Sequence, residues 1–189
     1  MKKIAIFASG NGTNAENICN YFINNKSVDV VLLATNNQDS FVVERIKKFN
    51  IPVFSFSREE LNNTKVVQKK LLECSVDLIV LSGFLLKVPE NIVSLFPNKI
   101  INIHPSLLPK FGGIGMYGEN VSRSVIDAKE IQSGITIHYV NNNYDEGNVI
   151  FQEKFPLVKN ESLESLLEKI RVLEMRFFPV VIEKVINSL

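Results

Sequence analysis

The sequence predicts an α/β protein with a doubly wound, Rossmann-like, mostly parallel sheet, antiparallel strands in its C-terminal half and a long C-terminal helix. Apolar, β-branched runs alternate with amphipathic helical segments through residues 3–83, which is typical of a parallel sheet covered on both faces. Right-handed crossovers between such strands place helices on both sides of the sheet. After residue 130, two alternating segments and then one long apolar stripe complete the pattern.

Four strands and three helices are expected in the first half of the chain. The strands are residues 3–8, 28–36, 51–56 and 76–83, and the helices are residues 15–23, 41–49 and 65–75. The strands are continuously apolar because both of their faces are expected to be buried. The helices carry apolar residues on one face and charges on the opposite face.

The second half is expected to be more varied. Its elements are a strand at 99–104, a turn-rich loop at 105–120, a short helix at 121–128 and antiparallel strands at 133–141 and 148–158. A loop as long as residues 105–120 is usually functional or disordered in a compact domain. Asn160 or Ser162 is expected to cap the final helix, and Pro179 should kink or restart it.

Composition excludes several function classes. The chain has 189 residues, 46% hydrophobic and 22% charged, with a net charge of +1, so no basic excess indicates nucleic acid. The apolar run near the N-terminus is too short for a secretory or membrane-spanning segment, so we expect a cytoplasmic protein without a membrane partner. Cys19 and Cys74 lack metal or redox spacing and are interpreted as buried apolar residues. No metal site is expected.

A glycine-rich turn, "SGNGTN" at residues 9–14, follows the first expected strand and opens the first helix. A helix N-terminus presents free N–H groups, and Gly12, Thr13 and Asn14 could bring backbone and polar side chains to a phosphate. The dinucleotide fingerprint is poorly matched, because no acidic residue directly follows the second strand, and there is no Walker lysine. The alternative is a tight turn without a ligand.

Asn102 and His104 lie two residues apart at the end of the fifth expected strand. Their side chains therefore share one face at the edge of the sheet where such folds bind ligands. A core histidine is the alternative. Asp145, in a later turn, would favour the imidazolium and raise the pKa of His104 if it lay beside it, although such a turn aspartate is common. His138, in the middle of a strand, is interpreted as a hydrogen-bonded structural residue, and the alternative is that it lines the cleft.

Five segments resemble one enzyme family in the same order along the chain. They are "SGNGTN", "GFLLKVP", "INIHPSLLPKFGG", "SGITIHYV" and "DEGNVIFQ", and they resemble phosphoribosylglycinamide formyltransferases of the formyl-folate superfamily. The resemblance implies transfer of a formyl group from 10-formyltetrahydrofolate to the amine of glycinamide ribonucleotide in de novo purine biosynthesis. It implies direct acyl transfer through an oxyanion, in a single domain of residues 1–189, with a phosphate-binding half (1–100) and a catalytic and folate-binding half (101–189).

The resemblance also assigns roles to individual residues. The catalytic residues are Asn102, His104 and Asp145; the ribonucleotide is held by Gly12, Thr13, Asn14, Arg171 and Glu174; the folate is held by Leu85, Leu86, Lys87, Val88, Asn141, Asn142, Asn143 and Tyr144. The implied partners are small-molecule substrates, the co-substrate is 10-formyltetrahydrofolate without a metal, and the protein is a monomer or a homodimer. Asn102 and an imidazolium at His104 would form the oxyanion hole.

Departures from the family pattern leave alternatives open. Relatives often have Arg where Leu86 stands and Gln where Arg171 stands, so Arg171 could contact phosphate instead of an amide. Another formyl-folate transferase or a hydrolase is one alternative, although we expect neither the extra C-terminal domain of the methionyl-tRNA enzyme nor the N-terminal domain of the hydrolase. A phosphate-binding module without catalysis is the other alternative.

Overall fold

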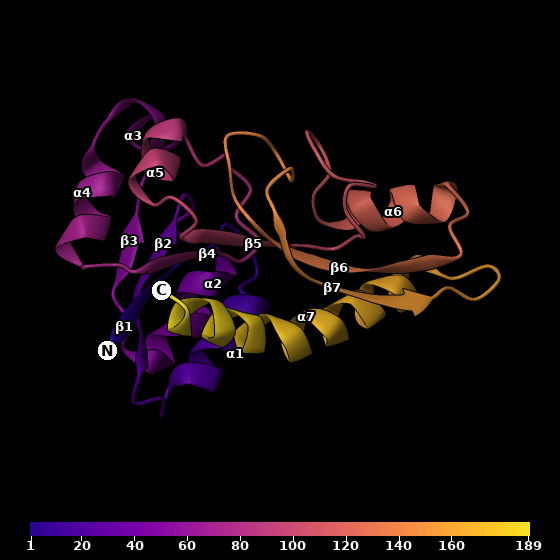
Figure 1. Cartoon of the computed structure of the whole chain (residues 1–189), viewed down its shortest axis with the longest axis horizontal. Coiled ribbons are helices and arrows are strands. Elements are labelled where there is room, and N and C mark those ends of the chain that lie inside the picture. Colours follow the sequence, from indigo (N-terminus) through magenta and orange to yellow (C-terminus); the bar gives the residue numbers. More distant parts are fainter.

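A seven-stranded sheet in the order β3-β2-β1-β4-β5-β6-β7 organises the chain. The computed structural model describes all residues from 1 to 189 (Figure 1). The strands are β1 (Lys2–Phe7), β2 (Val28–Thr35), β3 (Val53–Ser55), β4 (Leu78–Leu81), β5 (Ile100–His104), β6 (Gln132–Tyr139) and β7 (Val149–Pro156). The first five are parallel, whereas β6 runs antiparallel to β5 and β7 antiparallel to β6. This confirms the predicted fold class.

Seven α-helices connect and cover these strands. They are α1 (Thr13–Phe22), α2 (Phe41–Ile46), α3 (Arg58–Asn63), α4 (Val66–Glu73), α5 (Glu90–Leu95), α6 (Glu119–Asp127) and α7 (Leu163–Asn187). The sequence analysis did not predict α3 and α5, each of six residues. A signal for α3 was present, because Ser57 and Glu60 form a capping box at its start.

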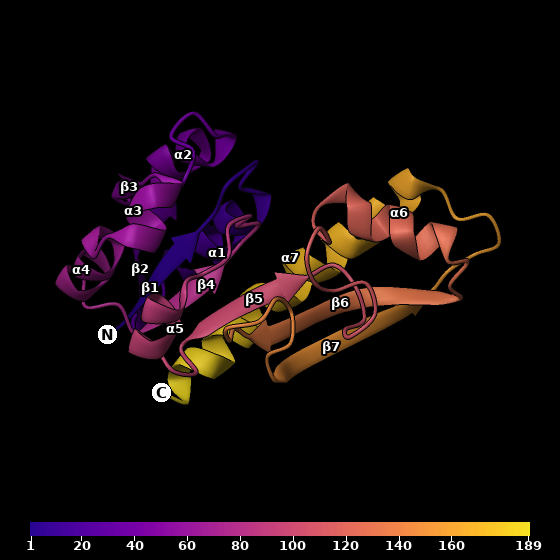
Figure 2. The ribbon, with the colours of Figure 1, turned by 90° about the horizontal axis from the view of Figure 1, so that it is seen from above.

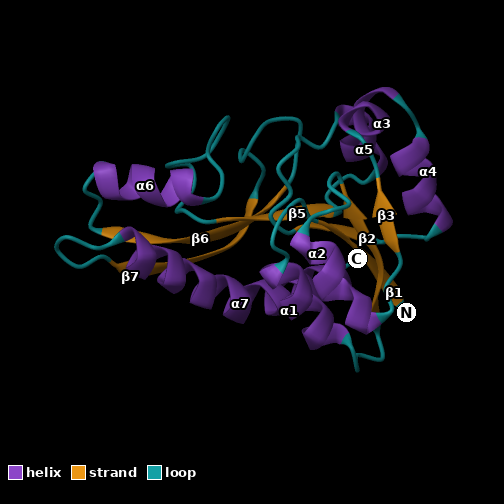
Figure 3. Cartoon of the chain, turned by 180° about the vertical axis from the view of Figure 1, so that it is seen from behind, coloured by secondary structure: helices purple, strands orange, loops and turns teal.

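Two hydrophobic clusters lie on opposite faces of the sheet. One joins the sheet to α1, α2, α6 and α7, and its members include Ile18, Val42, Val125, Ile170 and Ile182. The other joins the sheet to α3, α4 and α5, and its members include Leu61, Val67, Leu71 and Ile92. Figure 3 shows α1 and α7 on one side of the strands and α3, α4 and α5 on the other. Burial on both faces explains the continuously apolar parallel strands.

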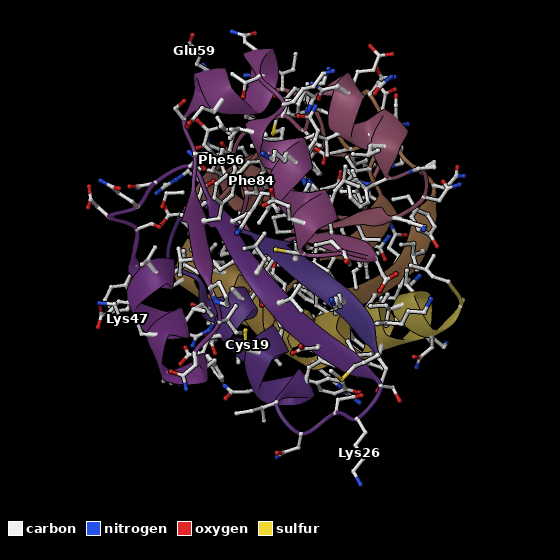
Figure 4. The ribbon with its side chains drawn as sticks, turned by 90° about the vertical axis from the view of Figure 1, so that its left-hand side faces the viewer. Cys19, Lys26, Lys47, Phe56, Glu59 and Phe84 are labelled. Carbon is white, nitrogen blue, oxygen red and sulfur yellow. The ribbon has the colours of Figure 1, made fainter.

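Aromatic rings fill the second cluster near the carboxyl ends of the strands. Phe84 packs edge-on against Phe7, with ring centroids 5.2 Å apart, and lies 6.1 Å from the ring of Phe56. Figure 4 shows Phe56 and Phe84 close together. On the other face of the sheet, burial raises the pKa of the Cys19 thiol to about 12. Cys74, expected to be buried, is only half-buried because it lies just past the end of α4.

A line of side-chain hydrogen bonds joins α1 to α7. Asn14 donates to Glu174 at 2.9 Å, and Asn17 donates to the carbonyl oxygen of Met175 at 2.8 Å. Met175 precedes Pro179 by four residues, so its carbonyl is the one that loses its helical partner to the proline. Because Asn17 supplies the missing donor, α7 runs unbroken from Leu163 to Asn187. Of the two expectations for Pro179, a kink or a restart, the restart does not occur.

The strand order reverses between β1 and β4, and the chain leaves these two strands in opposite directions along the sheet. From β1 the chain moves outward to β2 and β3, whereas from β4 it moves to β5. The two strand ends stay linked, because the Ser9 N–H donates to the Gly83 carbonyl at 3.1 Å and the Ser9 hydroxyl accepts from the Leu85 N–H at 3.0 Å. Ligands of open α/β sheets bind at such a reversal.

Candidate active site

A cavity of about 650 Å³ opens at the carboxyl ends of β4 and β5, beside the start of α1. Residues 81–88 after β4, the loop 113–118 before α6 and the loop 140–145 between β6 and β7 form its walls. Figure 2 shows the loops around β5 and β6 from above. The cavity lies beside the reversal in strand order between β1 and β4, so it is the candidate active site.

Asn102 and His104 both line this cavity from β5, as their spacing predicts. In the antiparallel pairing with β6, Asn102 lies opposite His138 and His104 lies opposite Thr136. His104 is 3% exposed. Its Nε2 lies 2.8 Å from the Phe111 carbonyl. Since a carbonyl oxygen can only accept, His104 carries a proton on Nε2.

The carboxylate of Asp145 lies between the only two histidine rings of the chain. Its Oδ2 is 3.6 Å from Nδ1 of His104, and its Oδ1 is 3.5 Å from Nε2 of His138. The resemblance implied the contact with His104. His138 is hydrogen-bonded, as expected of a structural residue, but the alternative also holds, because its ring lines the cavity and meets both Asn102 and Asp145. The strand register, which brings it there, could not be deduced from the sequence.

Burial has the largest effect on the pKa of His104. Desolvation lowers the pKa of its imidazole below the ordinary 6.5, and it outweighs the opposing effects of Asp145 and the Phe111 carbonyl. This direction opposes the expectation that Asp145 raises the pKa of His104 and holds the ring as an imidazolium. For Asp145 the effect of burial is outweighed. Burial raises the pKa of its carboxyl group, but the His138 and His104 rings and the Gly113 N–H together lower it below the ordinary value.

Two glycines after Phe111 hold the Asp145 carboxylate in position. The N–H of Gly113 donates to its Oδ2 at 2.9 Å. A Cβ added to Gly112 would lie 2.6 Å from a terminal methyl group of Leu108 and 3.2 Å from the Cβ of Asp145, so a larger residue there would displace these side chains. The length of this loop indicated a functional or disordered segment, and no role was expected for these two glycines.

The predicted ribonucleotide residues divide into two groups. Asn14 and Glu174 line the cavity and are hydrogen-bonded to each other. Burial raises the pKa of Glu174, and the Asn14 amide only partly offsets this effect. Gly12 and Thr13 begin α1 beside the cavity without lining it. Arg171 does not reach the cavity, because its side chain is 57% exposed and lies 3.7 Å from Glu168.

The predicted folate residues form two facing walls. The first is residues 85–88, and the second comprises Asn141, Asn143 and Tyr144, whereas Asn142 does not line the cavity. The Lys87 ammonium lies 5.6 Å from the centre of the Tyr144 ring and so bridges the walls through a cation–π contact. Arg58, at the start of α3, also lines the cavity and was not predicted.

Comparison with known proteins agrees with this geometry. A family model described as formyl transferase matches residues 2–182. The chain belongs to the formyl transferase family. Among curated relatives, the phosphoribosylglycinamide formyltransferase of Bacillus subtilis is 35% identical over 192 residues, covering 99% of this chain and 96% of that protein. The chloroplastic enzyme of Arabidopsis thaliana is 37% identical over 89% of this chain, and this chain spans only 60% of its length.

Solved structures of formyl transferases share the fold. Phosphoribosylglycinamide formyltransferase from Bacillus halodurans superposes with a TM-score of 0.87 at 35% identity, covering 97% of this chain and 95% of that one. Glycinamide ribonucleotide transformylase 1 from Geobacillus kaustophilus gives a TM-score of 0.88 at 32% identity, covering 98% and 99% respectively. In this formyl transferase, no three His, Cys, Asp or Glu residues are grouped to hold a metal ion. None of its helices is long and apolar enough to cross a membrane.

Proposed function

We propose that this formyl transferase moves the formyl group of 10-formyltetrahydrofolate to the amine of glycinamide ribonucleotide. One observation carries the proposal: Asn102, His104 and Asp145 meet in one cavity. The names of relatives that match nearly the whole chain support the choice of acceptor. The substrates are small molecules, and we propose that residues 1–189 act as one domain.

The two substrates would occupy different parts of the cavity. The start of α1, with Asn14 and Glu174 beside it, offers N–H groups to a phosphate and polar atoms to a ribonucleotide. The walls at residues 85–88 and 141–145 combine apolar side chains with amides, which suits a flat heterocycle such as the pterin of the folate. The reacting formyl carbon would then lie beside Asn102 and His104.

Acyl transfer needs a donor for the developing oxyanion. The amine of the ribonucleotide attacks the formyl carbon, and the carbonyl oxygen becomes negatively charged before the bond from carbon to the folate nitrogen breaks. The Nε2–H of His104 donates to the Phe111 carbonyl. The amide N–H of Asn102 is therefore the donor available from β5, and one such donor is worth roughly 10²–10³ in rate.

The proton of the attacking amine must reach the folate nitrogen that leaves. Because burial keeps the pKa of His104 low, its Nδ1 can accept a proton, directly or through one water molecule. The ionised carboxylate of Asp145, 3.6 Å away, would stabilise the resulting imidazolium. The same proton then passes to the folate nitrogen as the bond breaks, so the enzyme ends in its starting state.

A transfer assay tests this function. Purified protein is mixed with 10-formyltetrahydrofolate and glycinamide ribonucleotide, and loss of the formyl group from folate and formylation of the amine are followed together. Both must occur in equal amounts, and deformylation without the acceptor must be slow. Rapid deformylation without acceptor would identify a hydrolase, and no turnover with this acceptor would refute the proposal.

Variants connect the assay to the site. His104→Ala and Asp145→Asn should each lower kcat at least about 100-fold while changing substrate Kd far less. Asp127→Asn is the matched control, because Asp127 is an exposed aspartate at the end of α6 away from the cavity. Near-wild-type turnover in either site variant would remove the catalytic assignment.

A further inference from the structure

His138 has three polar contacts, and two of them are with the proposed catalytic residues Asn102 and Asp145. Its side chain is 2% exposed. Nδ1 lies 2.8 Å from the carbonyl oxygen of Tyr139, and Nε2 lies 3.2 Å from Nδ2 of Asn102 and 3.5 Å from Oδ1 of Asp145. A buried imidazole with partners on both nitrogens is held in one orientation, so the identity of those partners determines what the ring can do.

The Tyr139 carbonyl selects the tautomer of this ring. A carbonyl oxygen carries no proton, so the proton of the contact is on Nδ1 of His138. In the neutral ring Nε2 is then a bare acceptor, and the Nδ2 group of Asn102 is the donor within reach. A charged ring would instead donate to Asp145, but 3.5 Å is long for a charge-assisted bond, which is typically about 2.7–2.9 Å.

We propose that His138 is a positioning residue that orients the amide of Asn102. An amide group has two N–H bonds and one oxygen, and it can be turned by 180° in a site that does not distinguish its ends. By accepting one N–H, Nε2 of His138 keeps the nitrogen of Asn102 on the cavity side and leaves the second N–H for the oxyanion. The rate consequence rests on the proposed formyl transfer, whereas the orientation itself does not.

Two substitutions separate the nitrogens of the ring. In His138→Asn, the new side-chain amide can still donate to the Tyr139 carbonyl, because its nitrogen replaces Nδ1 of the histidine. No atom replaces Nε2, so Asn102 loses its acceptor. In His138→Gln, the longer side chain can return an acceptor to Asn102. We expect kcat to fall roughly 10- to 100-fold in His138→Asn, with a smaller change in KM, and to recover substantially in His138→Gln.

A double-mutant cycle tests whether His138 acts through Asn102. If it does, the combination of Asn102→Ala and His138→Asn should be within about threefold of Asn102→Ala alone, because the oriented group is already absent. Multiplying losses would show that His138 acts on the reaction by another route, such as through Asp145, and would overturn the proposal. Equal activity of His138→Asn and the wild type would also overturn it.

Nitrogen NMR gives a readout that needs no turnover. In the wild-type protein near neutral pH, the ¹⁵N shifts of His138 should show a protonated Nδ1 and a bare Nε2, and the side-chain amide signal of Asn102 should move in His138→Asn. A ring protonated on Nε2, or an unmoved Asn102 signal, would overturn the proposal. If the protein did not formylate glycinamide ribonucleotide, the proposed function would fail while this measurement still decided the inference.

Discussion

Replacement of Gly12 by alanine tests why the first turn is rich in glycine. Gly12 has φ +77°, and a Cβ added there would lie 2.5 Å from the Cβ and 2.7 Å from the Cα of Val42. Val42 cannot recede easily, because it is fully buried and its N–H donates to the Gly10 carbonyl at 3.0 Å. The left-handed backbone costs about 1–2 kcal/mol for a residue with a Cβ, and the overlap costs about 1–3 kcal/mol more.

The expected loss is therefore about 2–5 kcal/mol of the free energy of unfolding. Urea unfolding followed by circular dichroism measures it. Gly10→Ala is the matched control from the same turn, because nothing lies within 4 Å of its added Cβ and its φ is not positive. That variant should stay within about 0.5 kcal/mol of the wild type or be slightly more stable. Equal stability of the two variants would refute the steric argument.

Three further predictions concern other parts of the molecule. Asn17→Ala should lower the free energy of unfolding by about 1–3 kcal/mol, because the Met175 carbonyl, which has no helical partner before Pro179, loses its donor. Asn20 is exposed, so Asn20→Ala should change the free energy of unfolding little. Burial lowers the pKa of His104 below 6.5 in the folded protein, so as the pH falls the unfolded chain binds this proton at a higher pH than the folded protein does. The free energy of unfolding should therefore decrease as the pH drops through 6.5. Urea titrations at several pH values should show a weaker pH dependence in His104→Gln. In thiol titration, the half-buried Cys74 should react in the native protein, and Cys19, with a pKa of about 12, only after unfolding.

The parallel half of the sheet was predictable because each strand carries its own signal. Runs such as residues 28–35 and 78–81 are apolar on both faces, and amphipathic segments separate them. The short helices α3 and α5 were not predicted, since six residues span less than two turns and give no clear periodicity. Pro179 predicted a break that does not occur, because the donor for the carbonyl that the proline frees comes from α1, a helix distant in the sequence.

The site was predictable in composition but not in electrostatics. The two-residue spacing correctly placed Asn102 and His104 on one face, and the family resemblance implied Asp145. The position of His138 opposite Asn102 depends on the register of an antiparallel pair, which the loop between the strands does not specify. The pKa of His104 depends on how much protein surrounds the ring, and the sequence does not give that quantity.

The hydrogen bonds between α1 and α7 also constrain how the length of the chain can change. Asn14, Asn17 and Tyr21 follow one another at intervals of three and four residues and meet Glu174, the Met175 carbonyl and Glu183 in turn. One residue inserted into either helix rotates everything beyond it by about 100°, which would turn the later contacts away from their partners. Insertions and deletions should therefore be excluded from these two helices and confined to loops, even where single substitutions on the same helices are tolerated.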